Sequence, residues 1–102
     1  MAKDRTELHE LLVGILGSRY VYYQPPESLK LNYPCIIYSI SDDRPVYADN
    51  NVYKYLKRYT ITIIDADPDS VIPDKMLSLR YCSRDNSFVS DNLNHFVFSI
   101  YF

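Results

Sequence analysis

The sequence predicts an α+β domain in which a twisted, mainly antiparallel β-sheet carries two helices on one face, in the order αβββαββ. Two observations lead to this prediction. Residues 4–16 repeat apolar side chains at helical spacing, whereas residues 58–63 alternate strictly between polar and apolar side chains. The alternating strand then stops at the aspartate- and proline-containing segment 65–69, and a short helix follows at once.

The first helix is expected over residues 4–16. Its apolar face is formed by five residues at the i, i+3, i+4, i+7, i+8 spacing: Leu8, Leu11, Leu12, Ile15 and Leu16. Acidic residues gather in its first half, where they suit the positive end of the helix dipole. Gly17 is placed to end the helix in a left-handed conformation.

Three strands are expected next. A short strand covers residues 20–23, and a central strand covers residues 35–41, because both of its faces carry apolar residues. The polar, turn-rich segment 41–51 predicts a long projecting hairpin. Its return strand is expected from about Val52 to Asp65, which is longer than strands usually are.

A second helix is expected after this strand. Asp69 or Ser70 is predicted to cap it, Pro73 to lie in its first turn, and the helix to end near Leu79.

The chain closes with a predicted hairpin of residues 81–90 and 94–102, around the turn at Asp91 and Asn92. In the last strand one face is formed by Phe96, Phe98, Ile100 and Phe102.

The composition is that of one domain spanning residues 1–102. The net charge of −2 lacks the basic excess of free-standing nucleic-acid binders and of proteins that bind anionic membranes. No apolar run approaches the roughly 18 residues of a membrane-spanning helix, and the start of the chain lacks the apolar segment of a signal peptide. Eleven tyrosines and no tryptophan suit strands and surfaces that are wet in one state and buried in another.

Three aspartates at spacing two, Asp65, Asp67 and Asp69, invite comparison with a calcium-binding loop. Such a loop needs a glycine at its sixth position and a glutamate at its twelfth, where this chain has Ser70 and Met76. A turn followed by a helix cap is therefore the expectation.

Other candidate chemistry is sparse. His9 and His95 have no cysteine or carboxylate at metal-ligand spacing, and no serine lies in a Gly-x-Ser-x-Gly turn. Cys35 and Cys82 are expected to be buried free thiols. We therefore expect no enzymatic activity, no catalytic residues, no cofactor and no metal.

The run Tyr53-Lys54-Tyr55-Leu56-Lys57-Arg58-Tyr59 interleaves aromatic and basic side chains. Single-stranded nucleic acid stacks on such surfaces. The competing interpretation is a long strand whose tyrosines are half-buried and whose basic residues keep its end soluble. The many aspartates leave little electrostatic attraction for a nucleic acid, which stays an alternative partner.

Three blocks taken together resemble a known family. They are Tyr-Pro-Cys-Ile-Ile-Tyr-Ser-Ile (33–40), the stretch 58–77 followed by Tyr81 and Cys82, and residues 91–102. In order and spacing they are similar to the small tail completion, or tail terminator, proteins of long-tailed bacteriophages and prophages, particularly those of Gram-positive hosts.

The resemblance implies a non-enzymatic virion assembly protein. Members form hexameric rings that cap the tail tube, end its growth and present the surface that joins the head. The implied partners are further copies of the chain, the tail tube protein and head–tail connector proteins, with DNA passing through the ring without specific binding and no membrane. The implied location is the host cytoplasm and then the virion. The alternative within virions is another small head–tail connector component.

The projecting hairpin, from about Asp42 to Tyr55, is the segment expected to reach a neighbouring subunit or the tail tube. Its length and turn chemistry suggest this, and the candidate interface residues are Tyr47, Tyr53, Lys54 and Tyr55.

Overall fold

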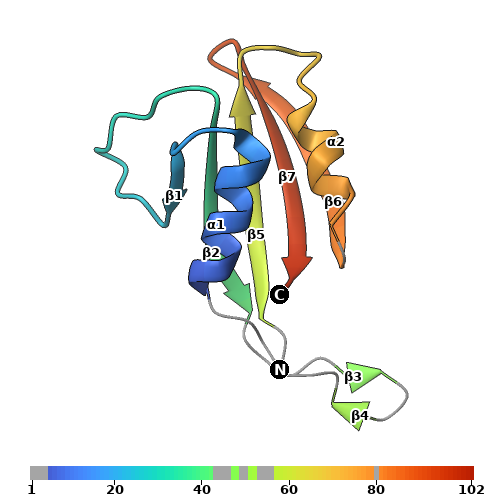
Figure 1. Ribbon diagram of the computed structural model, residues 1–102. Coiled ribbons are helices and arrows are strands. Elements are labelled where there is room, and N and C mark those ends of the chain that lie inside the picture. The colour runs from blue at the N-terminus through green and yellow to red at the C-terminus, as the bar shows by residue number, and fades with distance from the viewer. Residues whose placement is uncertain (1–4, 43–46, 49–50, 53–56, 80) are drawn as a thin grey trace.

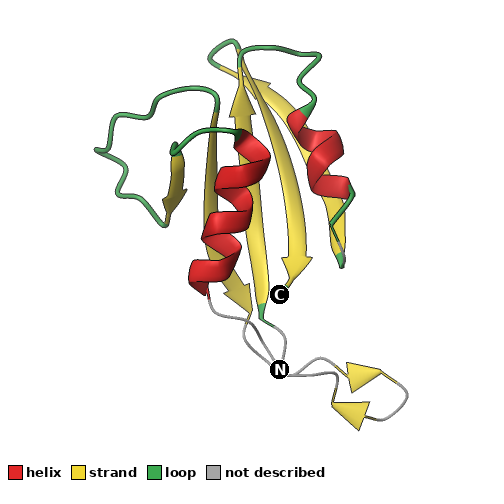
Figure 2. Ribbon diagram, in the orientation of Figure 1, coloured by secondary structure: helices red, strands yellow, loops and turns green. Residues whose placement is uncertain are grey.

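The computed structural model describes residues 5–42, 47–48, 51–52, 57–79 and 81–102. These residues form two helices, a five-stranded sheet and a separate two-stranded ribbon (Figures 1 and 2). In chain order the elements are α1 (Arg5–Leu16), β1 (Val21–Tyr23), β2 (Cys35–Asp42), β3 (Tyr47–Ala48), β4 (Asn51–Val52), β5 (Arg58–Asp65), α2 (Ile72–Leu77), β6 (Cys82–Ser90) and β7 (Leu93–Tyr101). The predicted α+β class with two helices is confirmed.

The five-stranded sheet is mixed, in the order β1-β2-β5-β7-β6. Three of its neighbouring pairs are antiparallel, but β1 runs parallel to β2, with Val21 opposite Ile36. The expectation of a mainly antiparallel sheet therefore needs correction at β1. Residues 24–34 form the loop that returns the chain to the starting end of the sheet, and such a crossover is what a parallel pair requires.

The predicted order αβββαββ also needs correction in the hairpin. The described chain has two short strands, β3 and β4, which pair only with each other, where one long return strand was expected. β4 ends at Val52, Lys57 lies outside any strand, and β5 begins at Arg58. Residues 53–56 lie outside the described part. The backbone of Lys57 exchanges hydrogen bonds with that of Phe102, which extends the pairing of β5 with β7 by one residue.

Both helices pack on one face of the sheet, and the hydrophobic core lies between them and the strands (Figure 1). Its largest fully buried side chains are Tyr38, Tyr59, Phe98, Leu8, Leu12, Ile36, Ile61, Ile63, Met76 and Ile100. The predicted aromatic face of the last strand is confirmed, with Phe96 and Phe102 packed partly buried against the same core.

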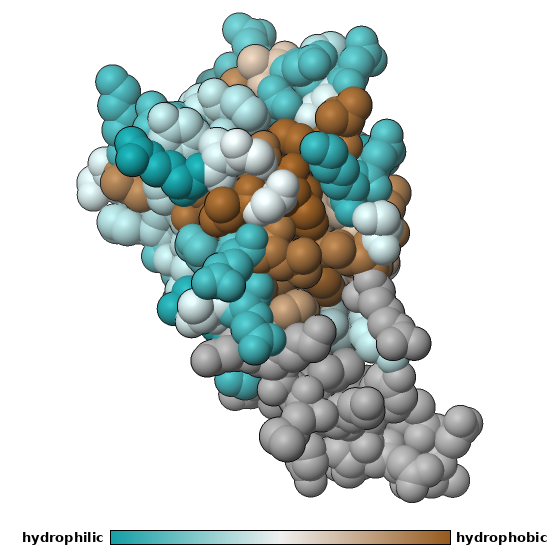
Figure 3. Space-filling model, in the orientation of Figure 1, coloured by the Kyte–Doolittle hydropathy of each residue, from teal (hydrophilic) through white to brown (hydrophobic). Residues whose placement is uncertain are grey.

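The apolar face predicted for the first helix is confirmed for Leu8, Leu12 and Ile15, which are buried. Leu16 is half-buried, whereas Leu11 keeps 36% of its surface exposed. Figure 3 shows apolar surface between α1 and α2, so the two helices leave part of this side of the molecule uncovered.

Two predicted turns are confirmed by backbone geometry. Gly17 has a φ of 79°, and its N–H donates to the carbonyl of Val13 over 2.9 Å, which ends α1 in the left-handed conformation. Asp91 and Asn92 have φ of 53° and 63°, the two positive values that a tight two-residue hairpin needs.

The second helix differs from its prediction at both ends. Its N-cap is Val71, which makes no side-chain cap, and it ends at Leu77 rather than near Leu79. Ser70 comes close to the expected role, because its hydroxyl accepts a hydrogen bond from the N–H of Ile72 over 3.3 Å. Pro73 lies in the first turn as predicted.

Candidate assembly interface

The four interface residues expected from the sequence lie mostly outside the described part of the chain. Tyr47 is placed in β3 by its backbone, while Tyr53, Lys54 and Tyr55 lie outside the described residues. Their role in an interface therefore stays a prediction.

The ribbon formed by β3 and β4 is the most distinctive feature of the described chain. Tyr47 pairs with Val52 and Ala48 with Asn51, in a sheet separate from the main one. Figure 1 shows the ribbon beyond the ends of β2 and β5, apart from the five-stranded sheet. An isolated two-stranded hairpin is at best marginally stable in water. Independent stability requires further strands with a hydrophobic face, or a helix to pack against.

The second feature is the long edge strand β6, which lies last in the sheet. Every residue after Cys82 is exposed, including Phe88 at 46% and Val89 at 68%. Proteins usually protect such edges with lysine, proline, a bulge or a very short strand. β6 has a bulge between Arg84 and Asn86 and two charged residues, Arg84 and Asp85, all in its first half. The opposite edge, β1, is three residues long.

The bulge in β6 serves a polar cluster on the sheet face that carries no helix. Ser99 of β7 is 4% exposed, and its hydroxyl accepts a hydrogen bond from an Nη of Arg58 over 3.1 Å. The same hydroxyl donates to the carboxylate of Asp85, the extra residue of the bulge. The Nε of Arg58 is buried without a hydrogen-bond partner in the described residues. The cluster links three strands across this face.

The two histidines do not belong to this polar cluster. His9 on α1 makes a 2.8 Å hydrogen bond with the hydroxyl of Tyr38, which is buried between α1 and the sheet. His95 stacks on Phe88 with ring centroids 4.7 Å apart, and its Nδ1 lies 3.1 Å from the carbonyl of Leu93. Each histidine is thus engaged by its own neighbours in the fold.

The aspartates after β5 form consecutive turns, as expected. The carboxylate of Asp65 accepts from the N–H of Asp67 over 3.0 Å, and that of Asp67 accepts from the N–H of Asp69 over 2.9 Å. Among the residues that the structure describes, no group of three or more His, Cys, Asp or Glu is arranged to hold a metal ion.

Both cysteines are free thiols, as predicted. The predicted burial is confirmed for Cys35, which is fully buried, but needs correction for Cys82, which is half-buried. Burial raises the pKa of Cys35 from 9.0 to about 11. Burial, and second to it the charge of Asp85, raises the pKa of Cys82 to about 11.

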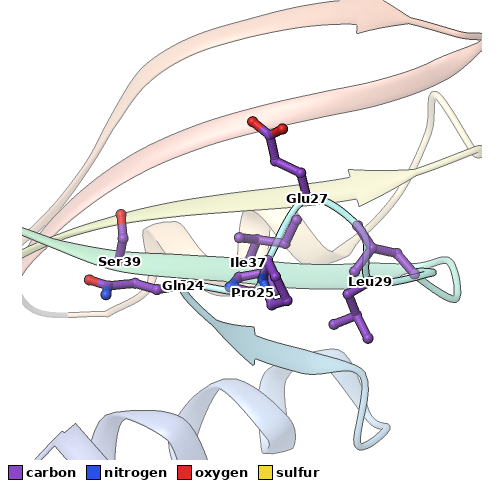
Figure 4. A pocket seen from close by; sticks show the side chains of 8 residues that line it. Gln24, Pro25, Glu27, Leu29, Ile37 and Ser39 are labelled. Carbon is purple, nitrogen blue, oxygen red and sulfur yellow. The ribbon is translucent and has the colours of Figure 1, made fainter.

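A shallow groove of about 450 Å³ lies between the crossover loop and β2 (Figure 4). Its lining is mostly apolar, with Ile37 of β2 and the prolines and leucines of the loop. Gln24 shapes one end: with a φ of 46°, it donates its N–H to Tyr38 and accepts from the N–H of Ile40 through its side chain. The side chain of Gln24 thereby continues the pairing where β1 ends.

Comparison with protein-family models, with curated proteins and with solved structures found no match to this chain. None of the described helices is long and apolar enough to cross a membrane. A functional proposal can therefore rest on the resemblance of the sequence blocks, on the separate β3–β4 ribbon and on the exposed edge strand β6.

Proposed function

We propose that this chain is a non-enzymatic virion assembly protein that caps the tail tube of a long-tailed phage or prophage as a ring. In this role it ends tail growth and provides the surface to which the head joins. Its partners are further copies of itself in a hexameric ring, the tail tube protein and the head–tail connector proteins. DNA passes through the ring, and the protein moves from the host cytoplasm into the virion.

The observation that carries the proposal is the ribbon of β3 and β4, which stands apart from the five-stranded sheet (Figure 1). Among the residues whose burial the structure describes, the core cluster lies in α1, α2 and the main sheet. A separate two-stranded ribbon, which is marginally stable alone, is suited to a contact between molecules. This supports an assembly role and is independent of the resemblance.

Composition is consistent with the same proposal. A ring through which DNA slides must not hold the phosphates strongly, and a net charge of −2 with mixed signs gives little such attraction. Closed rings need two different, complementary surfaces on each subunit. The ribbon and the exposed strand β6 are two different surfaces available for such contacts.

The direct test is electron microscopy of lysates from the parent phage or prophage with this gene deleted. The proposal expects filled heads beside unattached, over-long tails. Complementation with the wild-type gene should restore joined particles. Normal infectious particles from the deletion strain would rule out the assembly role.

A ribbon-free variant makes the test specific for the observation. Residues 43–57 are replaced by the two-residue turn Asn-Gly, which connects Asp42 to Arg58. These two residues already pair with each other between β2 and β5. The variant is expected to fold but to leave the deletion defect uncorrected. Full complementation by a folded ribbon-free protein would remove the ribbon from the proposed function.

A different small head–tail connector role would appear in the same images. Tails of normal length that fail to join filled heads indicate a joining component rather than a tail terminator. Over-long tails indicate the terminator role.

A further inference from the structure

Two side chains of α1 converge on one hydroxyl of the sheet. The hydroxyl of Tyr38 in β2 accepts a hydrogen bond from an Nη of Arg5 over 3.0 Å and lies 2.8 Å from Nδ1 of His9. Arg5 and His9 lie about one turn apart on α1, and the side chain of Tyr38 is 1% exposed. This hydroxyl therefore joins the first half of α1 to the sheet.

The direction of the hydrogen bond with His9 follows from the chemistry of its neighbours. A guanidinium group has only donors, so the bond from Arg5 uses the oxygen of the Tyr38 hydroxyl as its acceptor. Burial raises the pKa of Tyr38, so the hydroxyl keeps its single proton. That proton is left for Nδ1 of His9, which accepts it only when this nitrogen carries no proton of its own. The contact thus fits the neutral tautomer of His9 that is protonated on Nε2.

Protonation of Nδ1 reverses this arrangement. The imidazolium becomes a second donor to the same oxygen, and the proton of the Tyr38 hydroxyl loses its described acceptor. The hydrogen bond with Tyr38 raises the pKa of Arg5, so the guanidinium stays charged. Two cations then lie at positions i and i+4 of one helix, a spacing at which like charges are destabilising.

The surroundings of His9 offer little to offset a second positive charge. Its ring lies against that of Tyr38, with centroids 5.6 Å apart, and Tyr38 packs in turn on Tyr23 of β1 and Tyr59 of β5. The guanidinium of Arg5 lies 4.5 Å from the centre of the Tyr23 ring. In the described part of the chain, no carboxylate contacts the His9 ring. The other charged side chains of α1 and of α2, which packs against it, are exposed: Glu7, Glu10, Asp74 and Lys75.

We propose that His9 is a pH-sensitive latch: its neutral ring holds the first half of α1 against β2, and protonation of the ring releases it. Histidine is the side chain that ordinarily gains a proton between about pH 8 and pH 5. Because the native contact requires the neutral ring, its contribution to stability is present at the upper end of this range and is lost as the pH falls. Release would uncover apolar side chains, since Leu8 and Leu12 are buried under the same helix. The latch goes beyond the proposed function and does not depend on it.

Nitrogen NMR of the wild-type chain tests the direction of the hydrogen bond without any substitution. At about pH 7.5, the ring of His9 should carry a proton on Nε2 and none on Nδ1. The chain has two histidines, so the spectrum of His95→Asn assigns the signals. A ring protonated on Nδ1 alone, or on both nitrogens at this pH, overturns the proposal.

Hydrogen exchange of the backbone amides measures the release of α1. Its protection, corrected for the intrinsic effect of pH on exchange, is compared at about pH 7.5 and about pH 5 in the wild type and in His9→Asn. Asparagine places an amide oxygen near the position of Nδ1, which can accept the Tyr38 proton and gains no charge. The loss of protection at the lower pH should be at least several-fold larger in the wild type than in His9→Asn. Equal losses in the two proteins overturn the proposal.

The matched control is His95→Asn, which removes the other histidine, the one stacked on Phe88 of β6. In this variant α1 should lose protection at the lower pH as it does in the wild type. A loss that disappears in His95→Asn would assign the effect to the other histidine and overturn the proposal. Circular dichroism checks that both variants fold, and if His9→Asn does not, the NMR result on the wild type decides.

Discussion

Tyr38 joins α1 to the sheet through a single hydroxyl, and its replacement by phenylalanine gives a sharp test of the fold. The side chain is 1% exposed at the middle of β2. Its hydroxyl accepts a hydrogen bond from an Nη of Arg5 over 3.0 Å and makes a 2.8 Å hydrogen bond with Nδ1 of His9. The ring packs against Tyr23 and Tyr59, with centroids 4.9 and 6.2 Å away.

The expected cost follows from what Tyr38→Phe removes. Phenylalanine keeps the ring and its packing, so only the hydroxyl contacts are lost. Arg5 is exposed and regains water, and we assign no loss to its contact. The bond with half-buried His9 contributes about 1 kcal/mol of net stability. A domain of this size loses roughly 4–8 °C of Tm for each kcal/mol.

Urea unfolding followed by circular dichroism measures this loss. With a slope of about 1–3 kcal/mol per molar urea, the midpoint should fall by roughly 0.5 M with the slope unchanged. The matched control is Tyr22→Phe, which removes a hydroxyl from the neighbouring strand on a half-buried side chain outside the core cluster. Its midpoint should stay close to that of the wild type.

A double-mutant cycle with His9→Ala decides whether the hydrogen bond is the cause. Tyr38→Phe should cost clearly less when His9 is already absent, because the same bond cannot be lost twice. Equal costs in both backgrounds, or no cost in the wild type, would refute the argument that this hydroxyl ties α1 to the sheet.

Three further predictions follow from the backbone, the thiols and the ribbon. Gly14→Ala lies inside α1, where a Cβ meets open space, and should stabilise the protein by about 1 kcal/mol. Gly17→Ala lies at a φ of 79° and should destabilise the protein. Thermal unfolding compares the two variants, and equal effects would contradict the backbone roles assigned to these glycines. The native state holds the Cys35 proton more tightly than the unfolded state, so the contribution of this thiol to stability is complete below pH 9.0 and falls as the pH rises towards 11. Cys35→Ala should reduce this alkaline loss of stability in urea titrations. In the native protein Cys35 should be alkylated more slowly at pH 8 than Cys82, and the reverse order would argue against the burial of Cys35. The ribbon-free variant should keep the wild-type free energy of unfolding within about 1 kcal/mol, because the described core cluster lies in α1, α2 and the main sheet, which the variant retains. A larger loss in urea titration would show that the ribbon supports the domain.

The sequence pattern alone predicted those elements whose structure depends on residues close together in the chain. The spacing of Leu8, Leu12 and Ile15 specifies a helix with one buried face, and Gly17 ends it because only glycine adopts a positive φ there without strain. The turn at Asp91 and Asn92 is equally local, since two residues that tolerate a positive φ fix the register of the strands on either side.

The direction of β1 was beyond such local rules. Whether Val21–Tyr23 runs parallel or antiparallel to its neighbour depends on where the loop 24–34 crosses, and on the backbone groups that β2 leaves free. The length of that loop was the available signal, because an antiparallel hairpin needs only a few connecting residues. The same holds for Asp85, which reaches Ser99 only because a bulge forms where β6 pairs with β7.

For the candidate interface, sequence by itself determined that segment 41–51 is polar and turn-rich and that tyrosines lie beside it. Only the tertiary structure decided that the ribbon joins no other strand of the described chain and that β6 lies at an exposed edge. The physical reason is that the backbone N–H and C=O groups of a strand form their hydrogen bonds with whichever strands lie beside it. Neighbours in a sheet are set by the path of the whole chain, whereas the tendency to form a strand is set by the residues within it.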